Sequence, residues 1–103
     1  MFVTLWEFEV KPGCEERFET VYGPLGEWAR LFARDPLYRE TRLLRDPFRQ
    51  RTYLTLDFWA SQKGYEAFRE ANLADYTALD RACEAMTVSE RKIGGYMELR
   101  ENV

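Results

Sequence analysis

Residues 2–10 (FVTLWEFEV) alternate in side-chain character along the chain. One side of this segment carries Phe2, Thr4, Trp6, Phe8 and Val10. A period of two residues is typical of a β-strand that buries one face. Residues 38–45 and 51–59 are two further strand-like segments, and residues 46–50 between them have the length and composition of a hairpin loop. We therefore predict that these two strands pair antiparallel.

After Gly13 the apolar residues recur at steps of three and four, which is the spacing of one helical face. They are Phe18, Val21, Tyr22, Leu25, Trp28, Ala29 and Phe32. Gly23 and Pro24 interrupt this pattern without changing its phase, so we predict a break there, with Pro24 at the first position of the renewed helix. The break would let the second half, which carries Trp28, pack against the sheet as a wall of a binding site.

A second helical segment begins after Ser61, a favourable N-cap residue. Its periodic positions are Tyr65, Phe68, Asn72, Tyr76, Leu79, Cys83 and Met86. We predict a long helix here, bent near residues 72–75. Residues 87–90 (TVSE) fit a capping box and predict one short extra turn. A last strand follows over residues 92–100, in which Gly94-Gly95 marks a bulge.

The order strand, helix, strand, strand, helix, strand predicts an α+β fold of the ferredoxin-like βαββαβ type, with a four-stranded antiparallel sheet. We expect the first and third strands to be central neighbours. The third strand carries Leu54, Leu56 and Phe58 on one side and Tyr53 and Trp59 on the other, so neither side is plainly polar. Helices would cover one face of the sheet. A second copy of the sheet would cover the other, which predicts a homodimer.

The composition narrows the classes of function. Residues 1–103 are expected to form a single domain. The 18 acidic and 15 basic residues are mixed along the chain, with a net charge of -3, so we expect no nucleic-acid partner. No apolar run is long enough for a membrane span and no signal peptide is visible, so we expect no membrane association and a cytoplasmic location. The chain has no histidine, and Cys14 and Cys83 alone cannot complete a zinc site, so we expect no metal.

Four stretches carry a family resemblance: LWEFEVKPG, YGPLGEWARLF, YLTLDFW and YTALDRACEAMTVSERKIGGY. With them the chain resembles the antibiotic biosynthesis monooxygenase-like family over nearly its whole length. The resemblance implies a dimeric α/β barrel. Members of that family share a fold more than a chemistry. Some oxidise aromatic polyketides or quinols with oxygen and no cofactor, some degrade haem, and many have no known activity.

The segment DFWASQKGYEAF carries the most informative part of the resemblance. In the cofactor-free oxidases of the family, a tryptophan in this segment is followed six residues later by a tyrosine, and an asparagine precedes it by four. Trp59 and Tyr65 match that pattern, while Thr55 stands at the asparagine position. Many relatives place a histidine nine residues after the tryptophan, where this chain has Phe68. The resemblance therefore implies an oxidase site near Trp59 without a haem ligand.

Cofactor-free oxygenation needs a dry aromatic pocket in which the substrate becomes an anion and gives electrons to molecular oxygen. The candidate catalytic residues are Trp59, Tyr65 and Asp57, and Asp57 could act as a base if burial raises its pKa. The candidate ligand-binding residues are Trp28, Tyr53, Thr55 and Phe68. Glu7 and Asp57 could face each other as an acid pair or be neutralised by an arginine, and the sequence leaves both arrangements open.

Two functions from different classes follow from these observations. The first is a cofactor-independent monooxygenase that acts on a small aromatic or quinol-like compound, with oxygen as its second substrate and no cofactor. The second is a non-catalytic homodimer of the same fold that binds a small hydrophobic molecule or has a structural role. The spacing of Trp59 and Tyr65 favours the first, whereas Thr55 and Phe68, which depart from the family pattern, favour the second.

Overall fold

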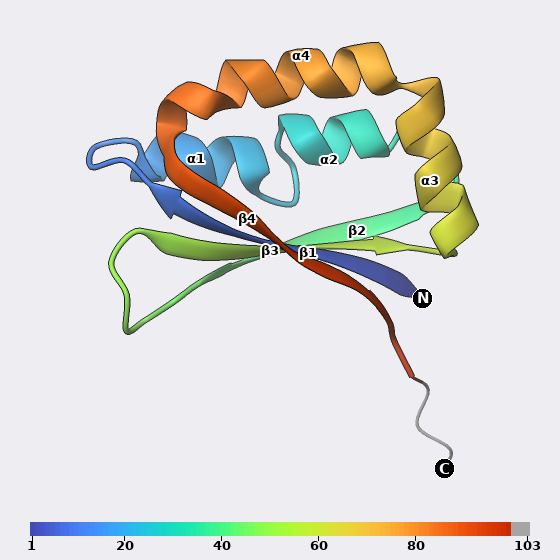
Figure 1. The fold of residues 1–103 in the computed structure, drawn as a ribbon, viewed down its shortest axis with the longest axis horizontal. Coiled ribbons are helices and arrows are strands. Elements are labelled where there is room, and N and C mark those ends of the chain that lie inside the picture. The colour runs from blue at the N-terminus through green and yellow to red at the C-terminus, as the bar shows by residue number, and fades with distance from the viewer. Residues whose placement is uncertain (100–103) are drawn as a thin grey trace.

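The computed structural model describes residues 1–99 and contains a four-stranded antiparallel sheet with helices packed over one face (Figure 1). The strands are β1 (Phe2–Val10), β2 (Tyr38–Arg45), β3 (Thr52–Trp59) and β4 (Thr87–Met97). The helices are α1 (Glu15–Tyr22), α2 (Glu27–Phe32), α3 (Gln62–Ala71), α4 (Leu73–Cys83) and the short 3-10 helix η1 (Glu84–Met86). The strand order is β2-β3-β1-β4. The predicted ferredoxin-like order and the central pairing of the first and third strands are confirmed.

The register of the central strands decides which side chains face the helices. In the antiparallel pairing of β1 with β3, Thr4 lies opposite Asp57 and Trp6 lies opposite Thr55. In the pairing of β2 with β3, Thr41 lies opposite Asp57 from the other side. Because directly opposite residues share a face of the sheet, Asp57 is flanked by two threonines on the helix-facing side.

β4 pairs with the outer edge of β1 and contains a bulge. Leu5 lies opposite Gly94, whereas the next residue, Trp6, lies opposite Lys92, so the register shifts by one residue between these pairs. Gly94 has a φ of 155°, a backbone conformation that residues with a Cβ rarely adopt. The bulge predicted in this part of the last strand is confirmed.

The first helical segment is broken where the sequence predicted. The break is a connection of several residues and not a kink within one helix. α1 and α2 are separated by residues 23–26. A Cβ on Gly26 would collide with the backbone oxygens of Thr20 and Val21, so the chain can fold back on the end of α1 only with glycine there. Pro24 lies inside this connection. The prediction that it begins the renewed helix is wrong, because helix geometry resumes only after Gly26.

The second helical segment is divided at Asn72, which confirms the bend predicted near residues 72–75. The hydroxyl of Ser61 caps the start of α3 as predicted. The short turn predicted over residues 87–90 is wrong, because these residues pair with β1 and belong to β4. The extra turn is η1, directly before that strand. The last strand, predicted over residues 92–100, instead runs from Thr87 to Met97, and Arg100 lies outside the described residues.

Aromatic side chains fill the layer between the helices and the sheet. Trp59 is completely buried. Its ring centroid lies between 5.1 and 5.5 Å from those of Phe32, Tyr38, Tyr65 and Phe68. Large aromatic rings bury much apolar area, so this cluster is a main part of the core. Leu25, which the periodicity placed on the same buried face, is instead 88% exposed, because it lies in the connection between α1 and α2.

Glu7 and Asp57 do not form an acid pair. Glu7 lies opposite Leu54 on the helix-free face, while Asp57 faces the helices. The Glu7 carboxylate accepts hydrogen bonds from Arg49 at 2.8 Å and Arg91 at 3.2 Å. These bonds lower the pKa of Glu7, so the alternative of neutralisation by arginine holds for this residue.

Several apolar side chains on the helix-free face of the sheet are partly exposed to solvent. Leu54 and Leu56 on the central strand β3 are half-buried, and Leu44 on β2 is 49% exposed. An apolar surface on a sheet favours association with another sheet, and the homodimer stays a prediction on that basis. No helix within residues 1–99 has both the length and the apolar character needed to cross a membrane.

Candidate functional site

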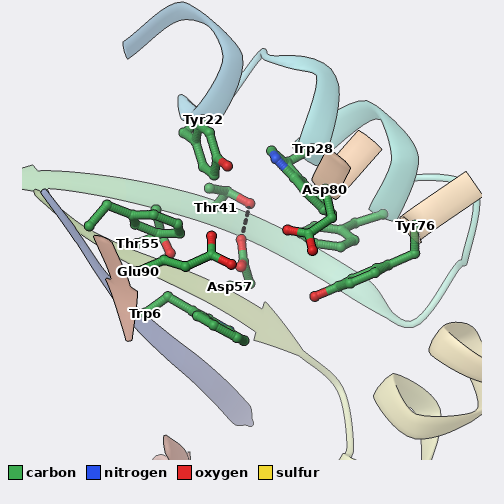
Figure 2. A pocket seen from close by; sticks show the side chains of 11 residues that line it. Trp6, Tyr22, Trp28, Thr41, Thr55, Asp57, Tyr76, Asp80 and Glu90 are labelled. Carbon is green, nitrogen blue, oxygen red and sulfur yellow. Dashed lines mark hydrogen bonds between the residues drawn. The ribbon is translucent and has the colours of Figure 1, made fainter. Parts of the chain in front are cut away.

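A pocket lies between the sheet and helices α1, α2 and α4 (Figure 2). The sheet contributes Trp6, Phe8, Thr41, Thr55, Asp57 and Glu90, and the helices contribute Tyr22, Trp28, Phe32, Tyr76 and Asp80. The space open to the centre of a water molecule is about 40 Å³. One water needs roughly 10–15 Å³ on this measure, so the pocket holds a few waters as it stands. A larger ligand must extend out of the pocket or displace side chains.

Asp57 is the buried carboxyl group at the sheet side of this pocket, with 8% of the residue exposed. Its Oδ1 accepts a hydrogen bond of 2.6 Å from the Thr41 hydroxyl. The Thr41 oxygen lies 2.7 Å from the Tyr38 hydroxyl, and because Thr41 gives its own proton to Asp57, Tyr38 donates in this second bond. Burial raises the pKa of Asp57 to about 7, although the bond from Thr41 acts to lower it. Near neutral pH the group therefore populates both protonation states.

Two further carboxyl groups reach the same space, Asp80 from α4 and Glu90 from β4 (Figure 2). Burial raises the pKa of Asp80, with a smaller contribution from the neighbouring Glu84. Burial also raises the pKa of Glu90, and Asp80 adds to that effect. Within residues 1–99, no group of three or more histidine, cysteine, aspartate or glutamate side chains is placed to hold a metal ion. The carboxyl groups of this pocket are thus separate acids and do not form a chelating cluster.

Aromatic rings form the walls of the pocket, and Trp28 lies beside two tyrosines among them. The centroid of Trp28 lies 6.0 Å from that of Tyr22 and 5.0 Å from that of Tyr76. Burial raises the pKa of both tyrosines, so each keeps its proton at neutral pH. The indole N–H of Trp28 is buried and has no hydrogen-bond partner among the described residues. The wall therefore combines apolar ring surface with one unpaired donor.

The structure brings three of the sequence-predicted residues together in this pocket: Trp28, Thr55 and Asp57. The burial that a basic role for Asp57 requires is present. Trp59 and Phe68 lie in the adjoining core, packed against Phe32, and are not part of the pocket lining. Their predicted roles in the site stay predictions.

The other two predicted residues lie elsewhere. Tyr65 lines a separate groove between α3 and the end of β4, together with Phe2 and Arg69. The Tyr53 hydroxyl donates a hydrogen bond of 2.6 Å to Glu19 of α1, away from the pocket. Burial and this bond raise the pKa of Tyr53 to about 12. Their predicted catalytic and ligand-binding roles stay predictions as well.

Sequence reasoning missed several residues of the site. Trp6 could have been found, because the period of two places it on the same side of β1 as Phe8. Thr41 becomes a partner of Asp57 only through the register of two strands. Asp80 and Glu90 carry no signal, since a single acidic residue in a helix or edge strand is usually a solvated surface group.

Comparison with known proteins supports the fold. No family model matches the sequence, and no curated protein matches it. A variant of SnoaB, a cofactor-independent oxygenase from Streptomyces nogalater, is 22% identical over 97% of this chain and 94% of its own, with a TM-score of 0.68. A candidate antibiotic biosynthesis monooxygenase from Nitrosomonas europaea is 18% identical over 97% of this chain and 100% of its own, with a TM-score of 0.68.

A third similar structure is a variant of MhuD solved with two manganese protoporphyrin IX molecules per active site. It is 18% identical over 100% of this chain and 99% of its own, with a TM-score of 0.69. The chain therefore has the fold of the antibiotic biosynthesis monooxygenase-like proteins, as its sequence predicted. The residues present do not fit a haem, because the described lining contains no histidine, cysteine or methionine, and Tyr22 and Tyr76 keep their protons at neutral pH. At these identities the likeness concerns the fold, and the chemistry has to be argued from this pocket.

Proposed function

We propose that the chain is a cofactor-independent monooxygenase that acts on a small aromatic compound in this pocket. The observation that carries the proposal is Asp57, a carboxyl group buried beside aromatic rings with its pKa raised to about 7. A general base is most effective when its pKa lies near the working pH. The fold is shared with a protein described as a cofactor-independent oxygenase, which supports the proposal by analogy.

In the proposed reaction, Asp57 in its carboxylate form takes a proton from a methylene group activated by the aromatic rings of the substrate. The hydrogen bonds from Tyr38 to Thr41 and from Thr41 to Asp57 hold the carboxylate in place. The substrate anion then passes electrons to molecular oxygen. One oxygen atom enters the substrate as a carbonyl, and the other leaves as water. This conversion supplies all four electrons that oxygen needs, so the chemistry balances without a cofactor.

The aromatic walls would exclude water from the anion and from reduced oxygen. Trp28 and Thr55, both in the lining, are the proposed contacts for the substrate ring and its oxygen atoms. Trp59 and Tyr65 lie outside the lining, and their proposed contribution is to support the pocket from the core. Substitutions that keep the size of these two rings should therefore have small effects on the rate.

The experiment is a screen of phenols, quinols and ring-activated methylene compounds for oxygen uptake. Removal of a general base lowers a rate by roughly 100-fold to 10,000-fold, and we expect a loss in that range for Asp57→Asn. The matched control is Asp75→Asn, because Asp75 is an exposed aspartate outside the pocket. Trp59→Phe and Tyr65→Phe should stay within about tenfold of the wild type. Equal rates for Asp57→Asn and the wild type would remove Asp57 from the mechanism.

A non-catalytic homodimer that binds a small hydrophobic molecule is the second candidate. The observation that favours it is the charge of the pocket. Asp57, Asp80 and Glu90 all oppose the formation of a substrate anion, and no basic side chain of the described residues lines the pocket to offset them. Ligand binding without oxygen uptake above the buffer rate, across the whole screen, would favour this candidate over the enzyme.

A further inference from the structure

The lining of the pocket has one sign of charge. It contains six aromatic side chains and three carboxyl groups, Asp57, Asp80 and Glu90, and its described residues include no lysine or arginine. Asp57 uses Oδ1 for its bond with Thr41, which leaves Oδ2 for a ligand. Neither Asp80 nor Glu90 takes part in an ion pair within residues 1–99. These acids therefore have unused capacity to bind a partner of opposite charge.

The two features of the lining favour the same kind of ligand. The face of an aromatic ring is electrostatically negative and attracts a cation placed over it, most strongly for tryptophan and tyrosine. Carboxylates attract the same cation, and the attraction is stronger in a partly buried site than in water. A carboxylate or phenolate ligand would face repulsion from the acids and from the ring faces alike. Complementary charge therefore points to a ligand with a positive group.

The basic residues near this region do not fill that role. Arg69 stacks on the ring of Tyr76, with 4.7 Å from its guanidinium carbon to the ring centroid, but it lines the separate groove that also contains Lys92. Burial raises the pKa of Asp80, and the nearby Arg69 partly offsets that rise. A metal ion is not the expected cation, because the carboxyl groups are not placed to chelate one. An organic cation needs no chelation, and it is therefore the kind of positive ligand that this pocket favours.

We propose that the pocket selects small aromatic compounds that carry a positively charged amine. The ammonium group would lie in the pocket near Asp80 and Glu90. The ring would lie against Trp6, Trp28 and Tyr76, and because it exceeds the space of a few waters it would extend out of the pocket or displace side chains. The inference deepens the proposed function by naming its substrate class, and it rests on this pocket being the substrate site. The ammonium group would also offset the carboxylates that otherwise oppose a substrate anion, so one compound would satisfy both the charge of the site and the chemistry of Asp57.

The test compares three compounds that share one ring and are close in size but differ in charge: benzylammonium, benzyl alcohol and benzoate. Isothermal titration calorimetry at neutral pH measures each dissociation constant. We expect benzylammonium to bind about tenfold more tightly than benzyl alcohol, and benzoate to bind more weakly than either. Quenching of the fluorescence in a Trp59→Phe background, where Trp6 and Trp28 are the remaining tryptophans, places the bound ring in the pocket.

A pair of matched double variants separates local from general electrostatics. Asp80→Asn with Glu90→Gln removes two acids from the pocket, whereas Asp75→Asn with Glu16→Gln removes two exposed acids from outside it. The first pair should lower the affinity for benzylammonium to about that for benzyl alcohol. The affinity for benzyl alcohol itself should stay unchanged, which also shows that the pocket is still folded. The second pair should leave the preference for the amine intact.

The proposal is overturned if benzylammonium shows no measurable binding, if benzyl alcohol or benzoate binds as tightly, or if both double variants weaken amine binding equally. The titrations are run without oxygen, so no oxygenation takes place and the outcome is independent of catalysis. Amine-selective binding with no oxygen uptake from any aromatic compound contradicts the enzyme and leaves the ligand class standing. Oxygen uptake with no preference for amines supports the enzyme and contradicts the proposed ligand class.

Discussion

The buried carboxyl group of Asp57 makes the stability of this protein depend on pH in a defined direction. Its pKa is about 7 in the folded chain, against an ordinary value of 3.8. Because folding raises the pKa, the folded state binds this proton more tightly than the unfolded state does. The contribution to stability is thus fully present below about pH 4 and is lost as the pH rises through about 7. At about 1.4 kcal/mol for each pH unit, the difference between the two pKa values corresponds to about 4 kcal/mol.

Asp57→Asn isolates this contribution. The amide has nearly the same shape as the carboxyl group, does not titrate, and keeps an oxygen that can accept the bond from Thr41. Between about pH 4 and pH 8 the variant should gain about 4 kcal/mol of unfolding free energy relative to the wild type. Other titrating acids, including Glu90 with its raised pKa and Glu7 with its lowered one, are present in both proteins and largely cancel in the difference.

The assay is urea denaturation followed by tryptophan fluorescence, in buffers from about pH 4 to about pH 8. Protein concentration is held constant, because the stability of a dimer depends on it. Asp75→Asn, which removes an exposed aspartate, should follow the wild-type profile at every pH. Parallel profiles for the wild type and Asp57→Asn would mean that the carboxyl group titrates at its ordinary pKa, and the reasoning from burial would be refuted.

Four further substitutions, the first with a matched control, test other parts of the structure. Gly26→Ala should lower the unfolding free energy in urea by more than about 2 kcal/mol, because its Cβ meets the oxygens of Thr20 and Val21, whereas Leu25→Ala next to it should change less than about 0.5 kcal/mol. Thr41→Val removes a bond that lowers the pKa of Asp57, so the rise of kcat/KM with pH, expected near pH 7 in the wild type, should move to higher pH. Trp59→Ala should cost about 3–5 kcal/mol in the same urea experiment, and a loss below about 1 kcal/mol would contradict the packing of this ring. Leu56→Arg, on the helix-free face, should turn a dimer into a monomer in light scattering at micromolar concentration, and a monomeric wild type would contradict the homodimer.

The fold does not specify a reaction, and the charge of the pocket restricts which ligands the site can bind. A haem site needs an axial ligand for the iron, and the described lining contains no histidine, cysteine or methionine. A phenolate site would be expected to present cations, yet the described lining presents Asp57, Asp80 and Glu90. If the chain is an oxygenase, its substrate should therefore bring its own positive charge.

The sequence by itself determined the order and type of the elements. Alternation in residues 2–10 predicted β1 to its last residue, because a strand with one buried face repeats its side-chain character every two residues. Gly23 and Pro24 marked the break between α1 and α2, since these residues restrict or free the backbone wherever they occur. The absence of histidine was equally readable from the sequence, and it removed the commonest metal ligand before any geometry was known.

Only the tertiary structure decided the site. Asp57 was visible as a possible base, but its pKa depends on burial and on Thr41, which reaches it through the register of β2 with β3. Asp80 and Glu90 line the same pocket because α4 lies over the face of the sheet to which the edge strand β4 contributes Glu90 (Figure 1). Secondary structure follows periodicities between near neighbours in the chain, whereas a pKa or a binding site follows from groups that meet through space. The acidity of this aromatic pocket arises from groups that meet through space, so only the tertiary structure shows it.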